Sequence, residues 1–141
     1  LYVGTGIASN KYDNTSAKTV TEMRNLLPGT WEGTMGKTKA TFTLKPSPVS
    51  EQHITGKVIL YYRKPIKQTV VADGNRYDIK SKEITLVVVE KNKENPRKRY
   101  VLTLNNGSDN AATMTGTYIN ETNGNRQEIK LTKTEENSSQ K

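Results

Sequence analysis

Leu26-Leu27-Pro28-Gly29-Thr30-Trp31 is the stretch that decides the fold, because two different periodicities meet in it. Upstream, Val20 and Met23 fall with the two leucines at the spacing of a helix that has an apolar face. Pro28 disfavours helical backbone at the preceding residue and ends that pattern. From Gly29 onward, apolar and polar residues alternate, as in a strand with one buried face. The sequence therefore predicts a short helix followed by β-strands.

The predicted helix runs from Ser16 to Leu27 and has about two turns. Thr19 and Glu22 have the spacing of a capping box, in which a hydroxyl and a carboxylate bind free backbone N–H groups at the start of a helix. A helix this short is not stable on its own in water. We therefore expect the helix to pack against the strands that follow it.

The rest of the chain contains about eight segments with a two-residue period, separated by turn-forming residues. The predicted strands are Gly29 to Met35, Lys39 to Lys45, Ile54 to Arg63, Lys67 to Ala72, Glu83 to Lys91, Arg99 to Leu104, Ala112 to Tyr118 and Glu128 to Lys133, with Arg76 to Lys80 as a further pairing segment. Turns are predicted at Gly36, Asp73-Gly74, Asn106-Gly107 and Asn123-Gly124. The strand from Glu83 is the most apolar, and Val87 and Val89 on its second face predict cover on both sides.

Consecutive hairpins of this kind predict an all-β fold, an antiparallel up-and-down barrel of about eight strands with a short N-terminal helix. Closing the barrel removes the sheet edges that would otherwise pair with other chains. A β-sandwich built from the same strands is the alternative. The predicted division is a flexible N-terminal arm at residues 1–15, a helix-plus-barrel domain at 16–134, and a polar tail at 135–141.

Composition limits the chemistry that the chain can perform. The 141 residues carry a net charge of +8 and no cysteine, which excludes disulfides, thiolate metal sites and a cysteine nucleophile. The single histidine, His53, cannot form a multi-histidine metal site, and no clustered carboxylates complete one. No apolar run approaches the roughly 20 residues that span a bilayer. The sequence therefore predicts a protein that is not an enzyme, has no cofactor and has no transmembrane segment.

Two basic clusters suggest a surface for polyanions. Arg63, Lys64 and Lys67 follow a pair of tyrosines, and Arg97, Lys98 and Arg99 precede Tyr100. Cations interleaved with aromatic rings are the pattern of single-strand nucleic-acid platforms. The strand alternation favours another interpretation. Tyr62 and Tyr100 have the same phase as Leu60 and Leu102 and would point into the barrel, while the cations would lie on its outer rim. Nucleic acid is accordingly the less favoured partner.

Two short motifs resemble those of known barrel families. Gly29-Thr30-Trp31, after a short helix, resembles the element that opens the first strand of lipocalin-like and avidin-like (calycin-type) barrels. Thr115-Gly116-Thr117-Tyr118 is similar to a run on a late avidin-type strand. Leu27, Gly29, Trp31 and Gly33 also match the start of lipocalin-like domains in bacterial envelope lipoproteins.

The resemblance implies a structural role for Trp31, as a plug at one end of the barrel. Avidin-type biotin sites use several tryptophans, and this chain has 1, so biotin binding does not follow. Lipocalins staple the barrel with a disulfide, which a chain without cysteine cannot form. The resemblance therefore implies a fold and a general binding role, and no particular ligand.

On this basis we expect a non-enzymatic, lipocalin-like binding or accessory domain that takes a small apolar molecule, or another envelope protein, as its partner. The predicted ligand-lining residues are Phe42, Val58, Leu60, Tyr62, Leu86, Leu102, Met114 and Tyr118. A polyanion-binding or nucleic-acid-binding module using the six basic residues is the first alternative, and a structural docking module of a longer chain is the second.

The expected location is extracytoplasmic: periplasmic, cell-surface or secreted. Asn14-Thr15-Ser16 and Asn120-Glu121-Thr122 match the N-glycosylation pattern and favour that setting weakly, since a chain rich in Asn and Thr matches it by chance. The chain begins at Leu1 without methionine, which suggests a trimmed or mature form. A lipid anchor upstream of Leu1 fits this expectation.

Overall fold

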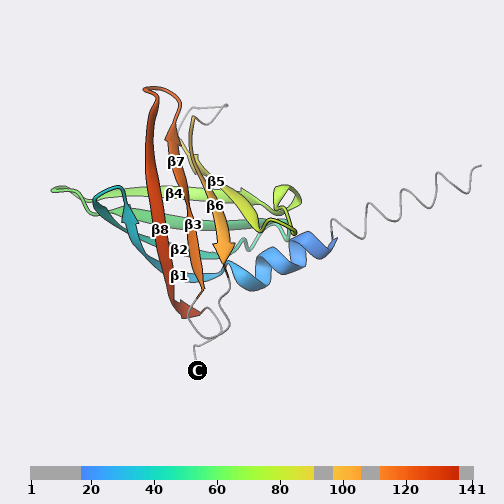
Figure 1. Ribbon diagram of the computed structural model, residues 1–141. Coiled ribbons are helices and arrows are strands. Elements are labelled where there is room, and N and C mark those ends of the chain that lie inside the picture. The colour runs from blue at the N-terminus through green and yellow to red at the C-terminus, as the bar shows by residue number, and fades with distance from the viewer. Residues whose placement is uncertain (1–16, 91–96, 106–111, 137–141) are drawn as a thin grey trace, which may run out of the picture.

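A computed structural model describes residues 17–90, 97–105 and 112–136, which form a helix and a closed barrel (Figure 1). The helix spans residues 17–26. The strands are β1 (Gly29–Met35), β2 (Thr38–Pro46), β3 (His53–Leu60), β4 (Ile66–Asp73), β5 (Glu83–Val89), β6 (Lys98–Asn105), β7 (Thr113–Asn120) and β8 (Asn125–Glu136). Each pairs antiparallel with its neighbours in sequence order, so the predicted up-and-down barrel is confirmed over the sandwich. No helix in these described ranges is long and apolar enough to cross a membrane.

The barrel closes where β1 meets β8. Gly33 of β1 lies opposite Leu131 of β8, and the register shifts by a bulge between Thr30 and Trp31. A Cβ atom on Gly33 would lie 1.8 Å from the carbonyl oxygen of Lys130, so the two strands approach too closely for any larger residue. This glycine therefore lets the first and last strands pair.

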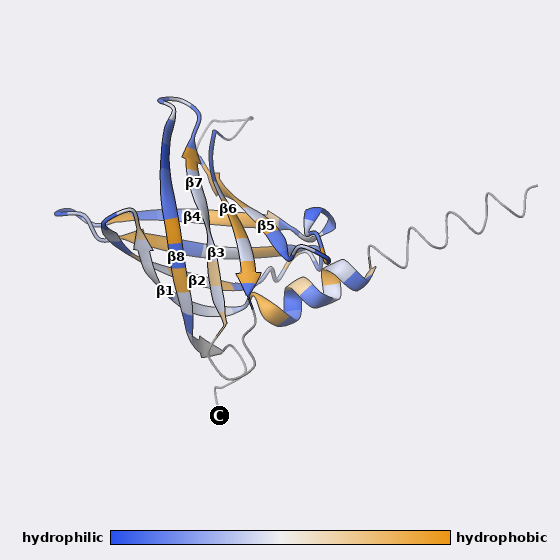
Figure 2. Ribbon diagram, viewed as in Figure 1, coloured by the Kyte–Doolittle hydropathy of each residue, from blue (hydrophilic) through white to orange (hydrophobic). Residues whose placement is uncertain are grey.

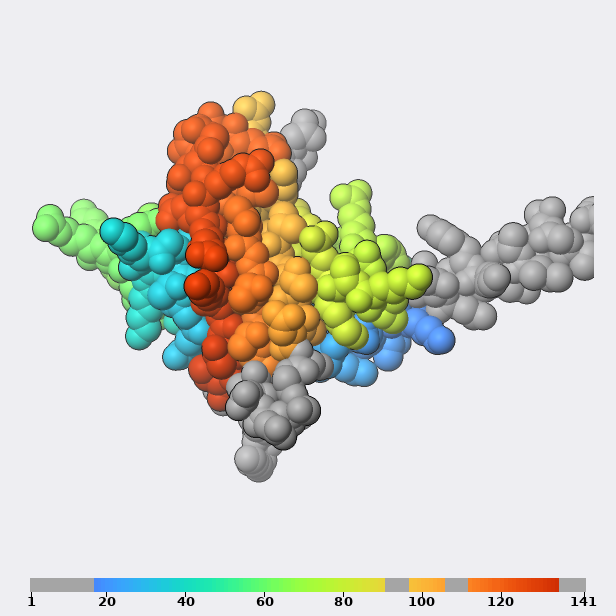
Figure 3. All heavy atoms as spheres, in the orientation of Figure 1, coloured from blue at the N-terminus to red at the C-terminus, as the bar shows by residue number. Residues whose placement is uncertain are grey.

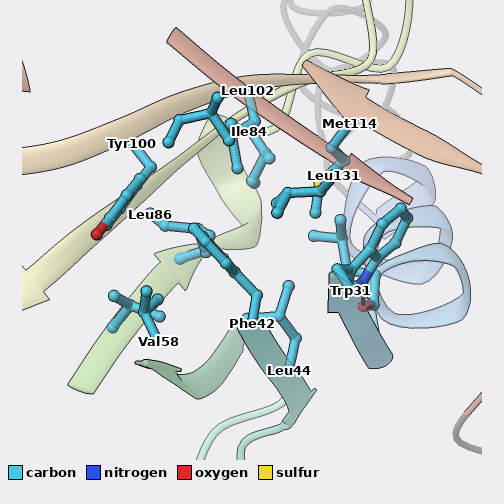
Figure 4. Close-up of a cluster of buried hydrophobic side chains, with 14 of the residues drawn as sticks. Trp31, Phe42, Leu44, Val58, Ile84, Leu86, Tyr100, Leu102, Met114 and Leu131 are labelled. Carbon is cyan, nitrogen blue, oxygen red and sulfur yellow. Dashed lines mark hydrogen bonds between the residues drawn. The ribbon is translucent and has the colours of Figure 1, made fainter. Parts of the chain in front are cut away.

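The core lies inside the barrel and follows the predicted alternation. Figure 4 shows large side chains from several strands converging, with Trp31 beside the helix and the Tyr100 hydroxyl on the opposite side. Figure 2 shows the same alternation as orange and blue along the strands. The largest fully buried side chains are Trp31, Tyr100, Phe42, Met23, Leu27, Met35, Leu44, Ile54, Ile84, Leu86, Leu102 and Met114.

The helix covers one end of the barrel, which we call the helix end (Figure 1). Met23 and Leu27 are fully buried there, and the indole Nε1 of Trp31 donates a hydrogen bond to the carbonyl oxygen of Leu27 at 3.0 Å. Arg24 donates to the backbone oxygen of Glu51 at 3.0 Å, in the connection between β2 and β3. Trp31 is therefore a buried plug at the helix end, as predicted.

Two predicted strand segments are wrong. The strand predicted from Ile54 to Arg63 ends at Leu60, because Leu60 pairs with Ile66 and the residues between them form the turn. Arg76 to Lys80 forms no strand, although Asp78 makes an isolated antiparallel bridge with Glu83. Asp73 instead caps a 3-10 helix, η1 (Gly74–Arg76), by accepting a hydrogen bond from the backbone N–H of Asn75 at 3.0 Å.

Three smaller expectations are also corrected. Thr19 lies inside the helix, so it does not cap it, and Glu22 pairs with Lys82 instead. Val89 is 53% exposed, so the second face of β5 is not covered there. Strand β8 extends to Glu136, two residues into the predicted tail. The predicted arm at 1–15 and the turn at Asn106-Gly107 lie outside the described residues.

Candidate binding surface at the distal end of the barrel

The predicted ligand-lining residues are brought together, with one exception. Seven of them are at most 6% exposed and share one core cluster: Phe42, Val58, Leu60, Leu86, Leu102, Met114 and Tyr118. Tyr62 is 39% exposed, because β3 has ended before it. The interior is therefore apolar as predicted, and Tyr62 belongs to the surface.

The end of the barrel opposite the helix, which we call the distal end, is closed by polar contacts. The hydroxyl of Tyr100 donates a hydrogen bond to Oε1 of Gln68 at 2.7 Å. Tyr100 packs edge-on against Phe42 at 5.0 Å between ring centroids and lies 4.9 Å from the Tyr118 ring. Gln68 is half-buried above this aromatic group. A molecule entering the barrel here has to displace Gln68 from Tyr100.

The electrostatics of these tyrosines show which groups meet at the distal end. Burial raises the pKa of Tyr100, and the hydroxyls of Tyr118 and Tyr62 raise it further. Burial also raises the pKa of Tyr118, against the lowering effect of a hydrogen bond with Gln68, while Tyr62 and Glu90 raise it. The exposed Tyr62 follows the paired Leu60 in the β3–β4 turn, which places it at the same end.

The two basic clusters lie at this same end. Leu60 pairs with Ile66 at the tip of the β3–β4 hairpin, which places Arg63, Lys64 and Lys67 there. Val87 of β5 lies opposite both Val71 of β4 and Arg99 of β6, so a single strand separates β4 from β6. The first cluster lies on the β3–β4 hairpin and the second at the start of β6.

Nearby carboxylates neutralise part of the second cluster. Nζ of Lys98 lies 3.7 Å from Oε1 of Glu90, and Arg99 forms an ion pair with Glu121. Arg97 is exposed. Within the described ranges, no salt bridge joins Arg63, Lys64, Lys67 or Arg97 to a carboxylate. Within these two clusters, the cations without a carboxylate partner among the described residues are therefore Arg63, Lys64, Lys67 and Arg97.

The turn of the β3–β4 hairpin, with the first two residues of β4, projects from the body of the barrel (Figure 3). We call residues 61–67 the β3–β4 tip. Tyr61 is fixed by its backbone N–H, which donates to the carbonyl oxygen of Lys39 at 2.9 Å, and Nζ of Lys39 lies 5.6 Å from the centre of its ring. Tyr61 and Ile66 are 43% and 46% exposed. The tip thus presents apolar and cationic groups together.

Some of these residues could not have been chosen from the sequence. Gln68 and Lys39 join the site through contacts with Tyr100 and Tyr61, whose partners only the barrel register determines. Ile66 carried no signal in the sequence either, because it has the same phase as the buried Val70 and Ala72 and is exposed only because it begins β4 at the hairpin tip.

A second feature lies at the helix end. An open cleft of about 550 Å³ separates the helix from the β4–β5 connection and is lined by Thr21, Glu22, Asn25, Ile79 and Lys82 among others. Nζ of Lys82 lies 2.7 Å from Oε2 of Glu22 across it. Lys82 has φ of 60°, a left-handed conformation that costs a lysine energy. The ion pair therefore fixes the helix to a strained turn.

Comparison with known proteins identifies no relative of this chain. No family model, no curated protein and no solved structure matches the chain.

Proposed function

We propose that this chain is a non-enzymatic binding domain, built on a lipocalin-like barrel, that recognises a polyanionic target at its distal end. The proposal includes an extracytoplasmic setting as part of an envelope or secreted protein. The observation that carries it is that Arg63, Lys64, Lys67 and Arg97 lie at the distal ends of their hairpins without carboxylate partners among the described residues. Exposed cations without carboxylate partners attract anions.

The rest of the molecule supports binding on this surface. The helix and Trp31 occupy the opposite end, and the interior positions carry large apolar side chains. The distal end, by contrast, combines exposed cations with the half-exposed ring of Tyr62 and the amide of Gln68. Charge in this arrangement attracts a polyanion, and the polar side chains offer it hydrogen bonds.

The test is binding of heparin and polyphosphate over a range of salt concentrations. Affinity should fall steeply with salt, because binding releases counterions. A variant carrying Arg63→Gln, Lys64→Gln and Lys67→Gln should bind more weakly and with a shallower salt dependence. The matched control carries Lys45→Gln, Lys57→Gln and Lys130→Gln, which remove the same charge from exposed positions away from the distal end. Equal losses in the two variants would overturn the proposal.

A small apolar ligand inside the barrel is the second candidate, favoured by the shared burial of Phe42, Leu86, Leu102 and Met114. Entry requires opening the Tyr100–Gln68 contact, so the ligand competes with the barrel's own side chains. Titration with fatty acids should then change the emission of the single tryptophan and raise the melting temperature. Gln68→Ala, which removes the acceptor above Tyr100, should strengthen this response. No response in either form would remove this candidate.

A further inference from the structure

The β3–β4 tip exposes apolar side chains where a barrel turn would normally be polar. Tyr61, Tyr62 and Ile66 are 43%, 39% and 46% exposed, and they share the tip with the cations Arg63, Lys64 and Lys67. Figure 3 shows this tip, in green, standing out from the barrel surface. Exposed apolar groups on a projecting hairpin are accessible to a partner.

The charge on the tip itself has one sign. Residues 61–67 contain the cations Arg63, Lys64 and Lys67 and no Asp or Glu. Lys39 from the neighbouring hairpin adds a further cation beside Tyr61. The partner of this surface is therefore anionic, and it has to offer an apolar environment close to its negative charges.

The backbone holds the tip in place. The Leu60–Ile66 pairing closes the hairpin, and the N–H of Tyr61 donates to the carbonyl oxygen of Lys39 at 2.9 Å, which joins the tip to β2. The exposed side chains are thus presented on a preorganised turn. Preorganisation lowers the entropy lost on binding.

A lipid surface fits these side chains better than a nucleic acid does. Ile66 has no aromatic face on which a base could stack, and its exposed surface gains free energy only in an apolar environment. Tyrosine rings favour the boundary between headgroups and hydrocarbon, and lysine and arginine favour anionic headgroups. The Tyr61 ring already has Lys39 over it, which obstructs stacking.

We propose that the β3–β4 tip docks the barrel onto an anionic lipid bilayer, with Ile66 and Tyr62 entering the interface and Arg63, Lys64 and Lys67 binding the headgroups. This inference rests on the polyanion-binding function proposed above and names the source of the anions. The barrel itself stays outside the membrane, and its distal end faces the bilayer.

Vesicle sedimentation tests the proposal with the full chain. Vesicles of phosphatidylcholine mixed with phosphatidylglycerol should bind the protein, and vesicles of phosphatidylcholine alone should bind it far less. Arg63→Gln with Lys64→Gln should weaken binding roughly fivefold for each charge removed. Lys45→Gln with Lys130→Gln is the charge control and should have a smaller effect, because these exposed residues lie outside the tip.

Ile66→Ser separates docking on lipid from simple charge attraction. It should lower binding to anionic vesicles about fivefold, because one or two methylene groups no longer enter the apolar phase. Binding to heparin should not change. Val49→Ser is the matched control, because Val49 is 91% exposed in the connection at the helix end. Ile66→Trp should show a blue-shifted emission component on anionic vesicles alone.

The possible failures are distinguishable. If heparin binds with the tip-dependent salt effect but anionic vesicles do not bind, the lipid inference is overturned while the polyanion function stands. An Ile66→Ser variant that binds vesicles as the unchanged protein does would also overturn it. Preferential binding of single-stranded DNA that depends on Tyr62 would replace lipid with nucleic acid. Loss of binding to every polyanion would overturn both proposals.

Discussion

Trp31 is hydrogen-bonded to Leu27, four residues earlier, through its indole Nε1 and the Leu27 carbonyl oxygen at 3.0 Å. This bond spans Pro28 and joins the first strand to the end of the helix. Nζ of Lys133, in β8, donates to the Leu26 carbonyl oxygen at 3.0 Å and lies 5.3 Å from the centre of the Trp31 ring. The single tryptophan therefore connects the helix, the first strand and the last strand.

Trp31→Phe should destabilise the barrel by about 2–3 kcal/mol. The smaller ring leaves a cavity, and the buried Leu27 carbonyl oxygen loses its donor. Urea unfolding followed by far-ultraviolet circular dichroism measures the change, since the variant has no tryptophan to report on. A loss below about half a kcal/mol would mean that the indole does not hold the helix in place.

Gly33→Ala should cost about 3 kcal/mol or more, because the new Cβ atom collides with the β8 backbone where the barrel closes. Gly124→Asn is the matched control. Gly124 has φ of 73° and nothing within 4 Å of an added Cβ atom, and asparagine tolerates that conformation. Equilibrium unfolding compares the two variants. Similar losses in both would contradict a special role for the β1–β8 seam.

The alternation along each strand could be predicted from the sequence, because successive side chains in a strand point to opposite faces of the sheet. It placed Phe42, Leu86, Leu102 and Met114 in the core correctly. It failed at Tyr62, which has the same phase as Leu60, because the hairpin turns before Tyr62 is reached. Pro65 signalled that turn, but the phase alone does not say where a strand stops.

The contacts that define the distal end could not be predicted, because they join residues far apart in sequence. The Tyr100–Gln68 hydrogen bond spans 32 residues, and it depends on the register of two ladders. Similarly, no local pattern links Glu22 to Lys82, which are 60 residues apart. The capping-box spacing at Thr19 and Glu22 was misleading, because Glu22 forms this tertiary ion pair instead.

The Glu22–Lys82 ion pair should be coupled in a double-mutant cycle by roughly 1 kcal/mol, since both side chains are only partly exposed. The cycle uses Glu22→Gln, Lys82→Met and the double variant, with chemical unfolding as the measurement. Hydrogen exchange at residues 17–26 should also accelerate in each single variant, because the helix loses its contact with the β4–β5 connection. Strictly additive single effects would show that the pair does not anchor the helix.

The buried tyrosines should make the barrel sensitive to alkali. Burial raises the pKa of Tyr100, and burial followed by the neighbouring Glu22 carboxylate raises that of Tyr77. In the unfolded chain tyrosine titrates near pH 10. Above that pH the unfolded state loses protons that the folded state keeps, so the free energy of unfolding falls as pH rises. Their stabilising contribution is complete below about pH 10 and is lost above it.

Tyr100→Phe removes one of these hydroxyl groups and so tests its contribution to the pH dependence of stability. At neutral pH the variant should lose about 1 kcal/mol, because Gln68 loses its hydrogen-bond donor. Above about pH 10 the unchanged protein should lose stability faster than the variant by about 1.4 kcal/mol per pH unit, the effect of one proton. The two stability curves should therefore converge with rising pH, although lysine titration affects both alike. Urea unfolding at a series of alkaline pH values measures the slopes, and parallel curves would show that the Tyr100 hydroxyl ionises as readily in the folded barrel as in the unfolded chain.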